Sequence, residues 1–423
     1  MKQEGRMRKT LIILLAMALP GCSDPDEARQ EKSAAEYHII DQKSEGQNIF
    51  SFVREYRLNV PEVMTSPVTL SPDGLKYLYF HRRDGLWFDS IEADGDPNNL
   101  EGRISNGSLG YADIPPFEWS SSSQDIYGVQ RKTVIPNGFA LEPLSTILIS
   151  SGGQVRKLPQ LEHPAGGLDG ILWVGHEGLA IGEFGTKGGY YRPSHEDHNP
   201  TIAMVDGRRG HIIQAESIPP LVYEGNIRAK LPSLIGEIDA RIDDQGKIHA
   251  IFVMEGHRWF EWQQGEKIRP LHSLDIDPSK APAKWFSATP DFSKVLIVKG
   301  LRATGVICEH NPDCPEPTPS TGTIAELRSL DTGDVLWNIE GTAYTFGNPL
   351  KPVISLDGQY AIISMPGDKS GRSSLALISM GDGTIIQKID KPSHGQRGAG
   401  FSKDGKQIWV SGLRSVAVYD IGK

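Results

Sequence analysis

The sequence predicts an all-β chain built from repeated units of short strands, and a recurring turn pattern is the first observation behind this prediction. In each copy a small hydroxyl residue is followed by Asp and Gly, or by close variants, and then by a run of β-forming residues. The copies lie at 70–74, 354–358 and 401–405, with looser copies at 119–123 and 288–292 and degenerate copies at 168–170 and 242–246. Asp and Gly suit a tight hairpin turn, because the carboxylate accepts backbone N–H groups and Gly readily adopts positive φ. Each copy therefore predicts a turn that leads into a strand.

The second observation is the spacing of these copies. One marker can be taken from each: Ser71, Ser120, Asp169, Asp243, Thr289, Ser355 and Ser402. The intervals between successive markers are 49, 49, 74, 46, 66 and 47 residues, and the two long intervals contain insertions at 185–200 and 308–322. A period of roughly 40–50 residues with several short strands per unit is typical of β-propeller blades. The sequence therefore predicts a single β-propeller over residues 49–423, with seven four-stranded blades.

The two ends of this region predict how the ring closes. The last unit offers only three strands, at 398–401, 407–411 and 415–420, whereas the alternating segment 49–58 has no unit of its own. Pairing of 49–58 with 415–420 supplies a fourth strand and removes an exposed edge. We therefore expect the N-terminal strand to close the propeller.

The repeats resemble those of WD-type and Tol-system propellers, and the resemblance covers roughly residues 49–423. One unit, at 327–337, resembles a quinoprotein-type blade through Asp331, Gly333 and Trp337. These resemblances imply a fold rather than an activity. Five tryptophans are expected to pack within blades: Trp173, Trp259, Trp262, Trp285 and Trp409.

The N-terminus predicts export and lipidation. Three basic residues between positions 6 and 9 precede an apolar run at 11–19 that is too short to span a bilayer, so residues 1–21 are expected to be a signal peptide. The tetrapeptide Leu-Pro-Gly-Cys, which ends at Cys22, resembles a bacterial lipobox and implies acylation of Cys22. The alternative is cleavage after Ala18, which leaves Cys22 as a free thiol.

Residues 22–48 are rich in polar residues and are expected to form a flexible tether. Ser23, rather than Asp, follows Cys22, which resembles the outer-membrane sorting of Gram-negative lipoproteins. We therefore expect a monomer in the bacterial cell envelope, anchored at the outer membrane and facing the periplasm, with membrane contact through the lipid alone.

The two insertions supply the candidate site residues. Cys308 and Cys314 are an even pair and are expected to form a disulfide in an oxidising periplasm. The alternative is a metal site that adds His310 and Asp313 to the two thiols.

The loop at 185–200 contains residue types that are favoured at interface hot spots, followed by two histidines. The candidate binding residues are Tyr190, Tyr191, Arg192, His195 and His198. A contact surface for a partner is expected here, and the alternative is a metal bound by the two histidines. No resident metal or other cofactor is expected.

The composition narrows the function classes. The formal net charge of −9 and the pI near 5.8 leave no basic footprint for nucleic acid. The sequence contains no Gly-x-Ser-x-Gly, phosphate-binding loop, dinucleotide fingerprint or His-Glu-x-x-His motif. We therefore expect a scaffold that binds a protein or an envelope polymer without catalysis. The alternative is a periplasmic hydrolase or lactonase with a metal or acid–base groups in the central channel, so enzymatic activity stays open.

Overall fold

The computed structural model describes most of the strands and turns of the chain. Contacts divide the chain into residues 1–43 and residues 44–423, and every described residue lies in the second unit. The described residues are 50–58, 68–81, 85–90, 102–105, 117–130, 133–134, 140–141, 145–150, 155–157, 162–163, 166–184, 201–218, 235–254, 258–274, 283–299, 301, 303, 318–344, 350–367, 374–389, 396, 398–412 and 415–422.

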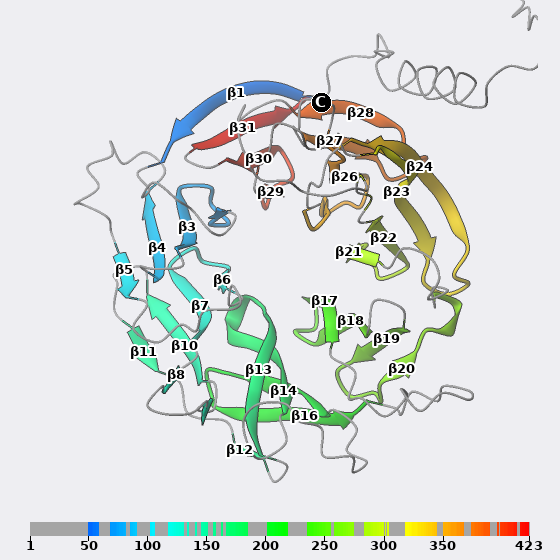
Figure 1. The fold of residues 1–423 in the computed structure, drawn as a ribbon. Coiled ribbons are helices and arrows are strands. Elements are labelled where there is room, and N and C mark those ends of the chain that lie inside the picture. The colour runs from blue at the N-terminus through cyan, green and yellow to red at the C-terminus, as the bar shows by residue number, and fades with distance from the viewer. Residues whose placement is uncertain are drawn as a thin grey trace, which may run out of the picture. The chain divides into compact units, whose positions relative to one another are not determined.

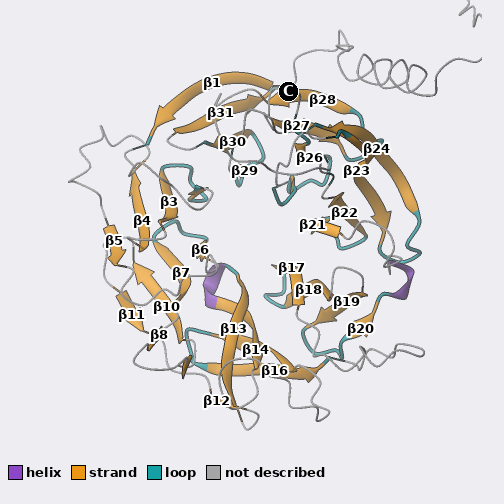
Figure 2. Ribbon diagram, in the orientation of Figure 1, coloured by secondary structure: helices purple, strands orange, loops and turns teal. Residues whose placement is uncertain are grey.

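Antiparallel sheets make up nearly all of the described chain (Figure 2). The first four-stranded sheet contains β2 (Thr69–Leu70), β3 (Lys76–His81), β4 (Gly85–Ser90) and β5 (Gly102–Ser105). The second contains β6 (Phe117–Trp119), β7 (Asp125–Gln130), β10 (Ser145–Ser150) and β11 (Val155–Lys157). A two-stranded ribbon joins β8 (Thr133–Val134) to β9 (Ala140–Leu141). A five-stranded sheet follows, with β12 (Glu162–His163), β13 (Gly166–Val174), β14 (Leu179–Phe184), β15 (Thr201–Asp206) and β16 (His211–Ser217).

The second half of the chain continues the series with four further sheets. One contains β17 (Ile235–Ile242), β18 (Ile248–Met254), β19 (Arg258–Gln263) and β20 (Arg269–Pro270). The next contains β21 (Ala283–Ala288), β22 (Lys294–Lys299), β23 (Ser320–Ser329) and β24 (Val335–Ala343). It is followed by β25 (Val353–Ile354), β26 (Tyr360–Met365), β27 (Ser374–Ser379) and β28 (Ile385–Ile389). The last joins β29 (Gly398–Phe401), β30 (Gln407–Ser411) and β31 (Ser415–Ile421) to β1 (Phe50–Arg57).

The sheets follow one another around a ring (Figure 1). One strand of each of these sheets contacts the corresponding strand of the next: β13 contacts β17, β17 contacts β21, β21 contacts β25, β25 contacts β29, and β29 contacts β2. Trp119 on β6 donates its indole N–H to the carbonyl oxygen of Thr69 on β2, at 3.3 Å. We call β2, β6, β13, β17, β21, β25 and β29 the inner strands. The predicted all-β single β-propeller is confirmed.

The strand count differs from the expectation of seven four-stranded blades. Within the described ranges, six sheets have four strands and the sheet that contains β13 has five. The reason is the length of β13, whose first two residues pair with β12 while the rest pairs with β14. The N-terminal strand β1 lies antiparallel to β31, with Phe50 opposite Ile421 and Arg57 opposite Ser415. This is the contact expected between segments 49–58 and 415–420.

The turns after six inner strands share one hydrogen-bond pattern, which explains the sequence repeat. In four of these turns the hydroxyl group of the first residue donates a hydrogen bond to the Asp carboxylate two residues later, at 2.6 Å. These turns begin at Ser71, Thr289, Ser355 and Ser402. The fourth residue of the turn has positive φ, and it is Gly in the clear copies. Ser123 and Phe292 take this conformation in the looser copies, with φ of 60° and 52°.

One degenerate copy is not a turn. The segment 168–170, with the marker Asp169, lies inside β13. The turn from β13 to β14 is instead the short helix η1 (His176–Gly178), in which Glu177 and Gly178 both have positive φ. The Leu-Asp-Gly pattern was therefore wrongly interpreted here, because its Asp and Gly belong to an extended strand.

Apolar side chains fill the interfaces between neighbouring sheets. One cluster joins the sheets of β15 and β18 through residues such as Met204 and Phe252, and another joins the sheets of β19 and β21 through Trp259 and Phe286. Trp259 and Trp262 are fully buried, as expected of packing residues. In the described part of the chain, no helix has the length and hydropathy of a membrane span.

Candidate functional site on the inner strands

The candidate residues from the sequence lie outside the described residues. These are Cys22, Cys308, Cys314, Tyr190, Tyr191, Arg192, His195 and His198. Lipidation, the disulfide and the contact loop therefore stay predictions.

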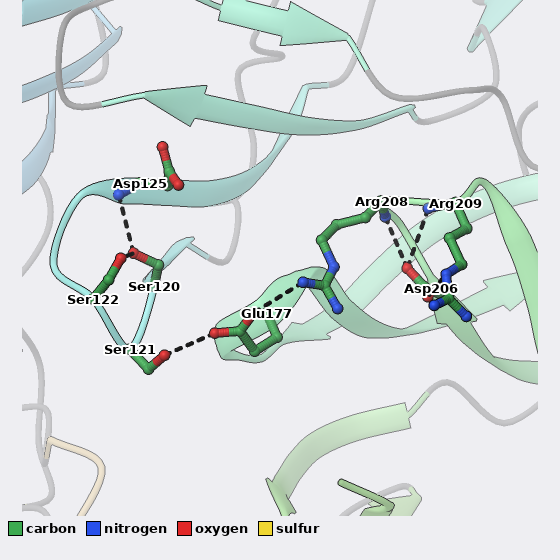
Figure 3. Close-up of polar contacts among 8 residues, drawn as sticks. All are labelled: Ser120, Ser121, Ser122, Asp125, Glu177, Asp206, Arg208 and Arg209. Atoms are coloured by element: carbon green, nitrogen blue, oxygen red, sulfur yellow. Dashed lines mark hydrogen bonds and ion pairs between the residues drawn. The ribbon is translucent and has the colours of Figure 1, made fainter.

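The polar network in Figure 3 lies where the second sheet meets the five-stranded sheet. Ser121 donates its hydroxyl hydrogen to Glu177 Oε1 at 2.7 Å, and Arg208 Nη1 donates to Glu177 Oε2 at 2.9 Å. Asp206 Oδ1 accepts the backbone N–H groups of Arg208 and Arg209, at 3.0 and 3.2 Å. These contacts tie the turns of two sheets together. Because the Arg208–Glu177 pair is well exposed, it contributes little energy and has a structural role.

Two further charged groups lie within single sheets. Glu326 Oε1 accepts from Lys299 and Arg328 at 2.9 and 2.8 Å, which joins β22 to β23. His249 Nε2 lies 2.8 Å from Glu261 Oε1, and this hydrogen bond is the main reason that the pKa of Glu261 lies below its usual range. Both groups stabilise neighbouring strands of one sheet.

A different arrangement is found around Lys351, which precedes β25. Its Nζ lies 2.9 Å from the carbonyl oxygen of Ile238, 3.3 Å from Asp239 Oδ1 and 3.4 Å from Glu237 Oε1. These acceptors belong to β17, although the sheet of β21 stands between the sheets of β17 and β25. Lys351 therefore links the segment before β25 to an inner strand that is not adjacent to β25, and its side chain remains 36% exposed.

Asp239 also binds β21, the strand between them. Its Oδ2 accepts the backbone N–H of Ala288 at 2.8 Å and the hydroxyl hydrogen of Ser287 at 3.2 Å. Arg241 Nη2 donates to the carbonyl oxygen of Ala288 at 2.6 Å. Asp239 and Arg241 lie on one face of β17, because side chains two residues apart on a strand point the same way. The three inner strands β17, β21 and β25 are thus joined by one polar cluster.

The charge of Lys351 follows from these contacts. Burial alone would lower the pKa of Lys351, but the negative charges of Asp239 and Glu237 raise it above its ordinary value. The side chain is therefore an ammonium at neutral pH. Glu237 and Asp239 carry two negative charges and Lys351 and Arg241 carry two positive ones, so the charges of the cluster sum to zero.

No protein-family model and no curated protein sequence matches the chain. The chemistry of the site therefore has to come from its own residues. Among the described residues, no group of three or more His, Cys, Asp or Glu side chains is placed to hold a metal ion.

Glu118 and Trp285 are two further polar residues on the inner strands, outside the charged pairs described above. Glu118 on β6 has its pKa raised to about 7, because burial disfavours the carboxylate more than a hydrogen bond to the backbone of Trp119 favours it. Trp285 on β21 has a buried indole nitrogen, and no hydrogen-bond acceptor lies within reach of it in the described structure. Its expected role as a packing residue leaves this donor unexplained.

The cluster was missed from the sequence, although a signal was present. Asp239, Trp285 and Lys351 each stand four residues before the first residue of the turn in their own unit. Because the inner strands lead into these turns, an alignment of the units on their turns would have placed these three residues at equivalent positions of their units. Sequence spacing alone does not reveal that the lysine reaches past one sheet to the next.

Proposed function

We propose that this chain is a scaffold that binds a protein or an envelope polymer and does not catalyse a reaction. The observation that carries the proposal is the fixed charge of Lys351 between Glu237 and Asp239. A general acid or base works best when its pKa lies near the working pH, whereas a pKa raised above the ordinary lysine value keeps the ammonium a permanent donor. A cluster held in one charge state is suited to binding.

The sequence supports a place for this scaffold in the cell envelope. We propose that Cys22 is acylated, that residues 22–48 are a tether, and that the propeller faces the periplasm from the outer membrane. The Cys308–Cys314 pair fits this oxidising compartment. The five-stranded sheet serves as the seventh blade of a WD-like or Tol-like ring, and Tyr190, Tyr191 and Arg192 extend the binding surface.

A second candidate function rests on Glu118. A carboxyl group with a pKa of about 7 has the proton affinity of a general acid or base at neutral pH. This observation favours the hydrolase or lactonase alternative, with Glu118 as the acid–base residue.

One pair of experiments separates the two functions. The purified chain is incubated with a panel of sugar lactones and glycosides, and in parallel it is used to capture partners from detergent-solubilised envelopes. The scaffold predicts no turnover, and it predicts partner capture that Tyr190→Ala with Tyr191→Ala weakens ~10²-fold without a change in melting temperature. Turnover that Glu118→Gln abolishes would instead establish the enzyme.

A further inference from the structure

The ammonium of Lys351 is placed to accept an additional ligand. Its contacts with Asp239 and Glu237, at 3.3 and 3.4 Å, are longer than the 2.7–2.9 Å of a strong charge-assisted hydrogen bond. The two carboxylate side chains are 12% and 17% exposed, whereas the lysine side chain is 36% exposed. The lysine is therefore the most exposed of these three side chains. A hydroxyl group that takes the place of one of the two longer contacts leaves the lysine on its carbonyl acceptor on β17.

Trp285 supplies a second group that requires a partner. It lies two residues before Ser287 on β21, so both side chains point to the same face of the strand, and the Ser287 hydroxyl donates to Asp239. Like Asp239 and Lys351, Trp285 stands four residues before the first residue of the turn in its own unit. Because no described residue accepts its buried indole N–H, Trp285 offers an unused donor on the same face of β21 as Ser287.

These groups select the chemistry of the ligand. The ammonium and the indole N–H donate hydrogen bonds, while the two carboxylates accept them. A hydroxyl group does both, so neighbouring hydroxyls satisfy donors and acceptors together. The positive and negative charges of the cluster balance, so an anionic ligand gains no net attraction, and Lys351 already occupies the position that a cation would take. An aromatic ring adds an apolar surface for the C–H face of a sugar ring.

We propose that Glu237, Asp239, Trp285 and Lys351 form a binding site for a neutral saccharide at the inner strands of the propeller. This inference rests on the proposed binding function and names the ligand class, a neutral glycan of the envelope polymer. The saccharide places hydroxyl groups on the lysine and the carboxylates and an oxygen acceptor on the Trp285 N–H.

The site is tested by calorimetric titration of the full chain with two neutral probes, the trisaccharides of N-acetylglucosamine and of glucose. At least one probe should bind. Trp285→Phe, which keeps the ring and removes the N–H, should weaken its binding ~10-fold, and so should Asp239→Asn. Lys406→Met is the matched control, because this lysine is 70% exposed and its ion pair is with Asp404 in its own turn, so binding should be unchanged.

The indole N–H resonance of Trp285, assigned from its loss in Trp285→Phe, gives a readout that does not depend on the stability of a variant. It should shift downfield when the saccharide binds to the unmodified chain. The inference is overturned if neither probe binds, or if a bound probe leaves this resonance and the affinity of both variants unchanged. Envelope capture without saccharide binding would overturn only this inference, whereas saccharide binding with turnover would overturn the non-catalytic function.

Discussion

Among single residues, Lys351 supplies the positive charge that Asp239 and Glu237 on β17 share. We predict that Lys351→Met lowers the free energy of unfolding by roughly 1–3 kcal/mol, because Asp239 and Glu237 then face each other without their cation. Urea unfolding at pH 7 measures this difference. Lys406→Met, at an exposed site, should change the stability by less than ~0.5 kcal/mol. Equal effects of the two substitutions would show that the cluster is not stabilising.

Glu118 gives a prediction that depends on pH. Its pKa is raised from 4.5 to about 7 in the folded chain, so between these values the folded state holds a proton that the unfolded state has lost. The contribution of Glu118 to stability therefore falls as the pH rises from about 4.5 to about 7. Glu118→Gln removes this loss. As the pH rises from 5 to 8, the free energy of unfolding of the variant should therefore increase by roughly 1–3 kcal/mol relative to that of the unmodified chain.

Chemical denaturation at both pH values measures the Glu118 effect. Glu266→Gln is the control, since Glu266 is exposed in a turn. A difference between Glu118→Gln and the unmodified chain that stays constant with pH would contradict a buried carboxyl at this position.

Among the structural elements, the repeated turn depends on a residue with positive φ. Gly405 has a φ of 68°, and a Cβ added there meets no atom within 4 Å. Gly405→Ala should therefore lower the free energy of unfolding by ~1 kcal/mol through backbone strain alone. Gly381→Ala is the matched control, because Gly381 does not have positive φ and its added Cβ makes only an ordinary contact with Ser379. Thermal unfolding that shows equal losses would contradict the strained position.

Phe292 shows how the same turn tolerates a residue with a large side chain. Its φ of 52° is unfavourable for an aromatic residue, yet its ring stacks on His249 at a centroid distance of 3.8 Å. The stack joins the turn before β22 to β18 of the preceding sheet. The loose sequence pattern at 288–292 thus retains the turn because tertiary packing offsets the missing Gly.

Closure of the ring is a property of the whole molecule. Deletion of residues 49–58 removes β1 and exposes the backbone N–H and C=O groups of β31 that it pairs with. We expect this variant to aggregate, as measured by size-exclusion chromatography with light scattering. A variant that lacks residues 23–47 keeps β1 and should remain monomeric. A monomeric 49–58 deletion with an unchanged melting temperature would show that this strand is dispensable.

The fold could be predicted from the sequence because its signal is local. Each turn is specified by a few consecutive residues such as Ser355 and Gly358, and their regular spacing indicates repeated blades. The same local pattern failed at Asp169, where the strand β13 continues through it. The spacing places Asp239 and Lys351 at the same position relative to their turns, but their contact could not be predicted, because they belong to units that are not adjacent and meet through the curvature of the ring.

The charge of Lys351 is the most direct test of a binding cluster that is held in one charge state. A pH titration of the Lys351 Cε resonance by NMR, assigned from its loss in Lys351→Met, measures this charge in the intact chain. We predict a titration midpoint above the ordinary value of 10.5, so the resonance should stay constant from pH 6 to pH 10. A midpoint below about 9 would show a lysine tuned for proton transfer and would contradict the non-catalytic binding site.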